Sequence, residues 1–234
     1  MPVNIEICSE FSYLIRFPGD KTNLPEPTEL GIAAQLIRDA FGENWVEVVP
    51  VFADLLVTLS PQAFTGPTEP QSIIAGCLEK IKNHDSDLGE PRLIEIPTCY
   101  DPEFADDLVE IAGKAGLSVD EAVALHTSRT YRVYAMGFCA GYAYMGDLPE
   151  PLRQPRRQSP RTRIPVGSLA VADFMTCVYP LSMPGGWHII GRCPIPLFTP
   201  DDQENPTLLK AGDQVRFTPV DKEAFYKLKQ RWQQ

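Results

Sequence analysis

The sequence lacks the motifs from which a self-contained active site is usually built. Its three histidines, His84, His126 and His188, stand far apart and match no zinc-ligand spacing, so no metal site is expected. Neither of the glycine-rich patterns that hold phosphates, G-x-x-x-x-G-K-S/T or a G-x-G-x-x-G after a strand, is present. No serine lies in a G-x-S-x-G context, so a serine-hydrolase triad has no local support. The residues alone therefore do not assign a reaction to this chain.

Positive charge, long apolar runs and paired cysteines are also scarce. There are 21 basic against 31 acidic residues, a formal net charge of −10, which argues against general nucleic-acid binding. No apolar run approaches the ~20 residues of a membrane span, and Glu6 and Glu10 interrupt any signal pattern at the N-terminus. The six cysteines form no C-x-x-C pair. These absences predict a cytoplasmic protein with reduced cysteines and no membrane partner.

Enough apolar sequence is present for a packed core, since 44% of the residues are hydrophobic. Residues 3–17 predict two short strands, and 45–51 and 55–59 predict two more. Apolar residues at helical spacing predict helices over 28–41, with Thr28 as N-cap and Gly42 as its stop, and over 69–81. Residues 1–82 therefore read as an α/β sandwich domain, with helices over one face of an antiparallel sheet.

A polar stretch at 83–91 predicts the domain boundary. Beyond it we expect a strand at 93–100, helices at 106–116 and 118–128 with a capping box at Ser118 and Glu121, and short strands near 131–138, 167–171, 176–179, 188–191 and 214–218. Closing such strands into a barrel over 91–220 would remove their exposed edges. Residues 221–234 predict a short C-terminal helix, and the whole chain reads as α+β.

Five arginines cluster within eleven positions of this acidic chain: Arg153, Arg156, Arg157, Arg161 and Arg163. The planar arginine fork suits two-point contact with carboxylates and phosphates, so a small anionic ligand or an acidic partner surface is one interpretation. The other is a solvated loop with local salt bridges, which is the commoner meaning of a charge run.

His126, near the end of a predicted helix, has two interpretations as well. It could transfer a proton near neutral pH, or it could favour the C-terminal end of the helix as a cation. The glycines at 137, 141 and 146 permit a close backbone approach or positive φ, and the aromatic side chains between them could line a pocket or fill a core.

The stretch from Glu95 to Asp213 resembles a known family, variously called the B-type subunit of 5-oxoprolinase, KipI or allophanate hydrolase subunit 1. The matching pieces are Glu95-Ile96-Pro97 with Tyr100, Leu125-His126, Gly137-Phe138, Gly141-Tyr142-Ala143-Tyr144, Pro155-Arg156-Arg157, Pro160-Arg161, Val166-Gly167-Ser168, Tyr179-Pro180, Pro184-Gly185-Gly186-Trp187, Ile190-Gly191-Arg192 and Gly212-Asp213. The resemblance implies an N-terminal α/β domain followed by a cyclophilin-like β-barrel.

The resemblance also implies a function and partners. It suggests one subunit of an ATP-dependent 5-oxoprolinase, which opens 5-oxo-L-proline to L-glutamate. The implied partners are a KipA-like protein, which is the C-type subunit, and a separate A-type subunit. Other members are described as inhibitors of a histidine kinase, or as the carboxyltransferase part of a urea carboxylase or allophanate system. ATP is implied as the cofactor, bound by or with a partner, and the chain is expected to be inactive alone.

On this resemblance the expected catalytic residues are His126, Arg157 and Arg161. The expected substrate-binding residues are Gly137, Phe138, Gly141, Tyr142, Tyr144, Arg156, Thr176, Gly186 and Trp187. Two departures concern the ligand. Ala140 stands where the family usually has proline, and Met175-Thr176-Cys177 stands where it usually has Gln-Thr-Gly. Either the ligand differs from the family's or the loop around Thr176 is not central to the chemistry.

Overall fold

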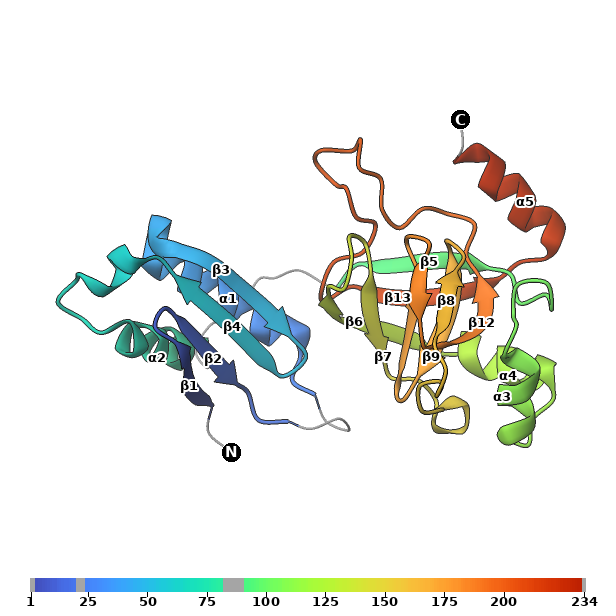
Figure 1. The fold of residues 1–234 in the computed structure, drawn as a ribbon, viewed down its shortest axis with the longest axis horizontal. Helices are drawn as coiled ribbons and strands as arrows, with labels where there is room; N and C mark the ends of the chain where they lie inside the picture. Colours follow the sequence, from blue (N-terminus) through green and yellow to red (C-terminus); the bar gives the residue numbers. More distant parts are fainter. Residues whose placement is uncertain (1–2, 20–23, 82–90, 233–234) are drawn as a thin grey trace. The chain divides into compact units, whose positions relative to one another are not determined.

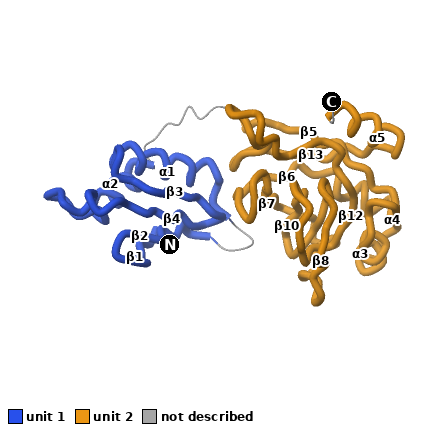
Figure 2. Tube along the Cα trace, turned by 45° about the horizontal axis from the view of Figure 1, so that its top comes forward, with its two compact units in different colours: residues 1–90 blue, residues 91–234 orange. Residues whose placement is uncertain are grey.

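The chain forms two compact units, Met1–Glu90 and Pro91–Gln234, which Figure 2 draws in different colours. The structure is a computed structural model and describes residues 3–19, 24–81 and 91–232. The boundary expected at 83–91 lies outside the described residues except for Pro91. The two units are therefore described one at a time.

The first unit is a four-stranded antiparallel sheet with two helices, as the sequence predicts. Its elements are β1 (Asn4–Ser9), β2 (Ser12–Arg16), α1 (Pro27–Phe41), η1 (Gly42–Asn44), β3 (Trp45–Val51), β4 (Asp54–Leu59), η2 (Pro61–Phe64) and α2 (Pro70–Ile81). The strand order is β1-β2-β4-β3. The prediction of Thr28 as N-cap is wrong. The N-cap is Glu26 and Pro27 starts the helix, because proline's fixed φ suits the first helical position.

Both helices cover one face of this sheet (Figure 1). Alternate residues of β4, namely Leu55, Val57 and Leu59, are buried against α1 and α2. The 3.6-residue period of α1 places its own apolar residues on the same side. Full burial of one such side chain contributes about 1.5–3 kcal/mol, so this shared cluster accounts for the independent compactness of the unit.

The second unit contains more strands than the sequence predicts. Its elements are β5 (Leu93–Thr98), α3 (Leu108–Lys114), α4 (Val119–Thr127), β6 (Thr130–Met136), β7 (Ala143–Gly146), η3 (Glu150–Leu152), β8 (Arg161–Ile164), β9 (Ser168–Ala172), β10 (Met175–Val178), β11 (Met183–Gly185), β12 (His188–Arg192), β13 (Gln214–Pro219) and α5 (Lys222–Arg231). The capping box at the start of α4 is confirmed. Strands β7, β8 and β11 were not predicted, because three or four residues carry too little alternation to be recognised.

Seven of these strands form a nearly closed barrel. Their order is β12-β9-β10-β7-β6-β13-β5, and β8 pairs with β11 in a separate two-stranded ribbon. The two ends of the sheet are joined by backbone hydrogen bonds between Cys99 and Arg192, at 2.9 and 2.8 Å. The predicted fold class, an α+β chain with an α/β sandwich followed by a β-barrel, is confirmed. The sheet is closed at this one residue pair, just beyond the end of β5.

The barrel strands bury side chains on both faces. Residues from all seven strands meet in one cluster, which must therefore occupy the barrel interior; Leu169 and Val171 of β9 belong to it. The alternate residues Ala170 and Ala172 belong to a second cluster on the outer face, together with Tyr142 and Trp187. The period of two along β9 thus contributes to two separate cores, and the outer one contains Tyr142 and Trp187, with Tyr144 packed against it.

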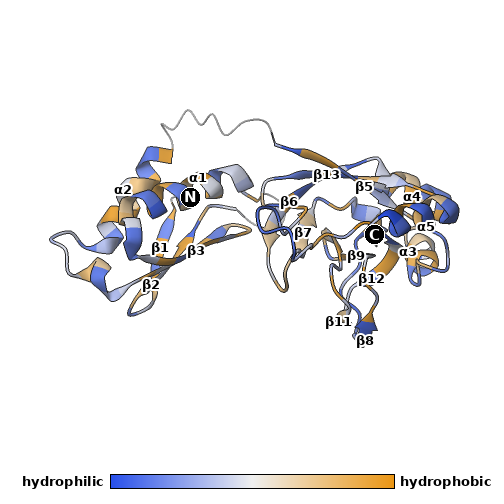
Figure 3. Cartoon of the chain, turned by 90° about the horizontal axis from the view of Figure 1, so that it is seen from above, coloured by the Kyte–Doolittle hydropathy of each residue, from blue (hydrophilic) through white to orange (hydrophobic). Residues whose placement is uncertain are grey.

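The C-terminal helix α5 is held by one apolar anchor. Phe225 is buried, and its ring lies 4.5 Å from that of Phe104, measured between centroids. Figure 3 shows most of α5 in hydrophilic colours, and Trp232 beyond its end is 58% exposed. Within α5, Phe225 is the buried residue. Among the helices of the described ranges, none is both long enough and apolar enough to cross a bilayer.

Replacing Gly141 by alanine is expected to lower the free energy of unfolding by about 2–4 kcal/mol, an overpacking cost added to left-handed strain. Gly141 has φ of +77°, and an added Cβ would lie 2.8 Å from the carbonyl oxygen of Leu197. Gly116→Ala is the matched control, because Gly116 has φ of +69° but nothing within 4 Å of its Cβ position. Chemical denaturation measures both. Equal costs would show that Gly141 is not retained for this close contact.

Candidate functional site

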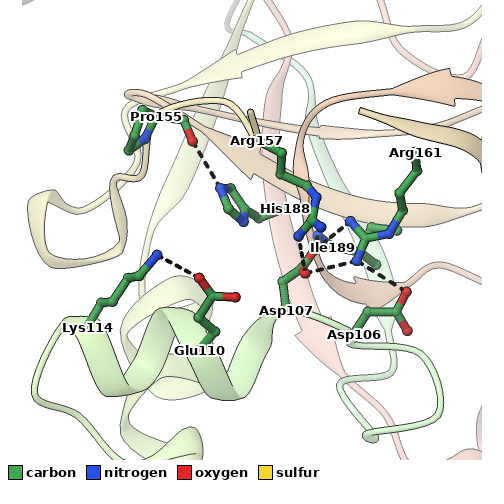
Figure 4. Close-up of polar contacts among 9 residues, drawn as sticks. All are labelled: Asp106, Asp107, Glu110, Lys114, Pro155, Arg157, Arg161, His188 and Ile189. Carbon is green, nitrogen blue, oxygen red and sulfur yellow. Dashed lines mark hydrogen bonds and ion pairs between the residues drawn. The ribbon is translucent and has the colours of Figure 1, made fainter. Parts of the chain in front are cut away.

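Asp107 links three segments of the barrel unit through one buried carboxylate. It lies just before α3 and is only 4% exposed. Its oxygens accept hydrogen bonds from Arg157 Nη1 at 2.8 Å, from Arg161 Nη1 and Nη2 at 2.9 Å each, and from the amide nitrogen of Ile189 at 2.7 Å (Figure 4). The Asp107 amide also donates to the Ile189 carbonyl at 2.8 Å. The carboxylate therefore fixes the arginine segment against α3 and β12.

The groups around Asp107 favour the charged form of its carboxylate. Burial alone would raise the pKa of Asp107, but hydrogen bonds from Arg161 and from the Ile189 amide, with the charges of Arg161 and Arg157, hold it below its ordinary value. The pKa of Arg161 is raised, chiefly by its hydrogen bond to Asp107. Asp106 lies beside the pair, 3.6 Å from Arg161 Nη2. One full charge of the two arginines is thus compensated inside the protein.

The remaining arginines of the cluster differ in what they contact. Arg153 donates to the carbonyl of Leu148 at 2.8 Å, and Arg163 donates to the Ser182 hydroxyl at 3.1 Å. Arg156 is exposed and has no hydrogen bond or ion pair within residues 3–19, 24–81 and 91–232. The cluster is therefore partly a set of structural arginines and partly, at Arg156, a cation available to a ligand.

A pocket of about 380 Å³ lies against this segment. It is lined by Glu110, Lys114, Gln154, Pro155, Arg156, Arg157, Gln158, Ser159 and His188. Lys114 pairs with Glu110 at 2.6 Å, and Nε2 of His188 lies 2.9 Å from the carbonyl oxygen of Pro155 (Figure 4). With three cations and one carboxylate in its wall, and histidine neutral, the lining carries a net charge of +2. Such a pocket suits a small anion.

The aromatic residues of the outer face divide into buried and exposed ones. Tyr142 and Trp187 are each 2% exposed, and the Tyr142 hydroxyl donates to Cys177 Sγ at 2.9 Å. Tyr144 packs edge-on against Tyr142, with ring centroids 4.9 Å apart, and is partly exposed. Phe138 is 66% exposed and has φ of +70°, in the left-handed region that a phenylalanine rarely adopts. Of the four, Phe138 offers the largest fraction of its surface to a ligand or partner.

Comparison with known proteins assigns the chain to a family. The model described as "Carboxyltransferase domain, subdomain C and D" matches residues 3–209. The chain belongs to this family. A protein of Bacillus subtilis strain 168, named as the B subunit of 5-oxoprolinase, is 36% identical over an alignment of 236 positions that covers 97% of this chain and 96% of that protein. Its namesake in Escherichia coli O157:H7 is 39% identical over 180 residues, 75% of this chain and 78% of that one.

A solved structure has a similar fold. The crystal structure of the protein TTHA0988 has a TM-score of 0.74 and 30% sequence identity over 90% of this chain. This chain spans 39% of that longer one. The fold of this chain therefore also occurs as part of a longer chain.

The structure does not bring His126, a position matched to the family, to the arginines. His126 is 1% exposed, its Nδ1 lies 2.9 Å from the Tyr100 hydroxyl, and its ring packs on Tyr131 and Phe217 at 5.0 Å. Burial lowers its pKa to about 3, so the ring is neutral at physiological pH. The contacts of Arg157 and Arg161 are instead with Asp107, at the start of α3.

Two other expected binding positions, Thr176 and Gly186, make hydrogen bonds within the protein. Thr176 is fully buried and its hydroxyl donates to the carbonyl of Ala170 at 3.0 Å, which leaves it no surface for a ligand. The carbonyl of Gly186 accepts a hydrogen bond from the Arg157 amide at 2.8 Å and so positions that arginine. Gly137 has open space where a Cβ would stand. Asp107 and His188 were missed at the sequence level, because an isolated Asp or His carries no spacing signal.

His126 is expected to make the protein less stable as the pH falls from about 6.5 towards 3. The unfolded chain takes up a proton at this histidine at the ordinary pKa, whereas the folded chain does so only at about 3. The unfolded state therefore binds more protons in this window, and stability drops by up to about 1.4 kcal/mol per pH unit. Denaturation of the native chain and of His126→Gln at pH 7 and pH 5 measures the difference. Parallel pH curves would contradict the assigned burial.

Proposed function

We propose that this chain is one subunit of an ATP-dependent 5-oxoprolinase, which opens the lactam ring of 5-oxo-L-proline to give L-glutamate. The observation that carries the proposal is the 36% identity to a protein named as the B subunit of 5-oxoprolinase, because it spans 97% of this chain and 96% of that one. A match over nearly the whole of both chains covers the barrel and the sandwich together, so it supports a shared role rather than one shared domain.

The pocket beside the arginine segment supplies charges that this reaction needs. Opening an unactivated lactam is made feasible by phosphorylating its carbonyl oxygen, and both the substrate carboxylate and a phosphoryl group are anions. Arg156, Arg157 and Lys114 line the pocket and would hold an anion in place. Arg161 does not line it and acts through Asp107, so we assign it a positioning role. Holding the substrate correctly is itself a large part of catalysis.

ATP would supply the phosphoryl group when bound, and we assign its binding to the assembled enzyme. A pocket of about 380 Å³ with a net charge of +2 fits a carboxylate or a phosphoryl group. The sequence contains no phosphate-binding loop that would hold a whole nucleotide. The nucleotide therefore requires surfaces that a partner provides.

The proposed partners are the KipA-like protein and the separate A-type subunit. We propose that the barrel unit makes the main contact with the KipA-like protein, since the exposed Phe138 and the exposed Arg156 both belong to it. Aromatic and arginine anchors are typical of protein interfaces. The unit 91–234 has its own cores and is a compact body, so it can be expressed as a fragment.

Co-purification tests this assignment. The tagged chain, expressed with its two untagged partners, is expected to retain the KipA-like protein, and residues 91–234 alone are expected to do the same. The chain alone is expected to form no L-glutamate from 5-oxoproline and ATP, because it lacks a complete nucleotide site. Retention that requires residues 1–82, or steady turnover by the single chain, would contradict the proposal.

A further inference from the structure

Two nitrogen atoms in the wall of the pocket of about 380 Å³ beside the arginine segment have no hydrogen-bond partner within the described part of the chain. They are Nδ1 of His188 and Nε of Arg157, and both are closed off from solvent. His188 as a whole is only 6% exposed. Burying a polar group without a partner is costly, so each atom marks a place where a bond is missing. Both side chains line the same pocket, and Figure 4 shows the His188 ring between the Pro155 segment and the Arg157 guanidinium.

The hydrogen-bonding role of each nitrogen follows from the atoms already engaged. A carbonyl oxygen only accepts, so Nε2 of His188 carries the hydrogen that it donates to Pro155. In the tautomer that carries its hydrogen on Nε2, Nδ1 is then an acceptor, and a donor from a ligand or from a water can pair with it. Arg157 uses Nη1 for Asp107, which leaves the edge formed by Nε and Nη2. That edge presents two parallel donors, the geometry that a carboxylate matches with its two oxygens.

The pocket therefore has a donor pair and an acceptor in one cationic wall. Its net charge of +2 comes from Lys114, Arg156 and Arg157 against Glu110, and Arg156 has no partner within the described residues. A volume of about 380 Å³ falls in the lower part of the range for small-molecule sites, roughly 300–1,000 Å³. The complementary ligand is small and carries a carboxylate next to an N–H group. In 5-oxoproline the carboxylate is attached to the carbon that neighbours the ring N–H.

We propose that this pocket binds the cyclic amide acid itself, with its carboxylate on the Nε–Nη2 edge of Arg157 and on Arg156, and its ring N–H donated to Nδ1 of His188. The inference rests on the proposed function and names its substrate site. Because both orphan nitrogens are closed off from solvent, side chains that line the pocket must shift when the ligand enters. A phosphoryl group is the competing occupant, and the test separates the two.

The test uses the assembled enzyme and measures KM for 5-oxoproline and KM for ATP separately. His188→Gln keeps an amide donor for the Pro155 carbonyl and replaces the Nδ1 acceptor with an amide oxygen at a different position, whereas Arg156→Gln removes the charge that has no partner within the described residues. Each is expected to raise KM for 5-oxoproline by at least ~10-fold, the effect of losing one good hydrogen bond or ion pair, with KM for ATP within ~2-fold. Arg163→Gln, in the same arginine cluster but outside the pocket lining, is the control and is expected to change neither.

A rise in KM for ATP without one for 5-oxoproline would assign the pocket to phosphate and overturn the inference. Unchanged values for both substrates would overturn it as well. If the assembled enzyme has no activity on 5-oxoproline, the proposed function fails. Calorimetry on the chain alone then tests whether the pocket binds 5-oxoproline. Native chain should bind 5-oxoproline at least ~10-fold more tightly than cyclopentanecarboxylate, which lacks the N–H, and His188→Gln should remove that difference. Equal affinity for the two acids, or no binding of either, would contradict the proposed binding site.

Discussion

Replacing Asp107 by asparagine is expected to lower the free energy of unfolding by about 3 kcal/mol and to abolish most activity of the assembled enzyme. The substitution removes the buried charge that accepts hydrogen bonds from Arg157 and Arg161, and it turns an amide donor towards guanidinium donors. This loss of unfolding free energy is at the low end for a broken buried ion pair. The side chains of Arg157 and Arg161 are 29% and 22% exposed, so water can hydrate their guanidinium groups once Asp107 is replaced. Chemical denaturation and turnover of the complex measure the two effects.

Asp106→Asn is the matched control, since Asp106 is the neighbouring carboxylate and contacts the same Arg161 at 3.6 Å. Its side chain is 55% exposed, so the expected cost is below about 1 kcal/mol.

Asp107 should also make the free energy of unfolding depend on pH in the acid range. Its folded pKa is below the ordinary value, so its stabilisation is present above the unfolded pKa of about 3.9 and is lost as pH falls through the folded pKa. Equal losses of unfolding free energy for Asp107→Asn and Asp106→Asn at pH 7 would contradict the role assigned to the Asp107 carboxylate.

Tyr142→Ala is expected to lower the free energy of unfolding by about 3–5 kcal/mol, the usual cost of truncating a buried aromatic ring. Tyr142 is 2% exposed, and its ring packs edge-on against Tyr144, Tyr179 and Trp187. Its loss leaves a cavity in the outer-face cluster and deprives Cys177 of a hydrogen bond. Thermal and chemical denaturation of the isolated chain measure this cost directly.

Phe138→Ala provides the contrast, because Phe138 is 66% exposed on the same face. We expect a change in unfolding free energy below about 1 kcal/mol, but binding of the KipA-like partner weakened by ~10-fold or more, as for an aromatic interface anchor. Titration calorimetry with the purified partner measures the second effect. A Phe138→Ala chain that binds the partner with native affinity would contradict the proposed interface at this loop.

The sandwich unit could be read from the sequence almost completely, because its elements are long enough to show their period. The 15 residues of α1 repeat the helical spacing several times, and β4 alternates over six residues. The barrel was predicted as a class but not strand by strand. β11 has three residues and contains Pro184, and β7 has four, so neither shows a period before it ends. Their positions depend on tertiary pairing instead.

Only part of the candidate site could likewise be predicted from the sequence. The arginine cluster is visible because its members are neighbours in sequence, whereas Asp107 lies 50 residues from Arg157 and 54 from Arg161. A contact across that separation exists only once β12 and α3 are packed together. The same reasoning explains His126, for which the sequence left proton transfer and helix capping open, and which is buried against Tyr131 and Phe217 of the barrel core. Residue types indicated the chemistry of an anion site, and only the fold indicated which members of the cluster are already paired.

Formation of L-glutamate from 5-oxo-L-proline and ATP tests the central claim most directly, when it is measured with the two proposed partners in the presence and absence of this chain. We expect glutamate to form only when the native chain is present, and to fall to a small fraction of that rate when the chain carries Asp107→Asn. Glutamate formation at the full rate without the chain, or none when all three proteins are combined, would contradict the account.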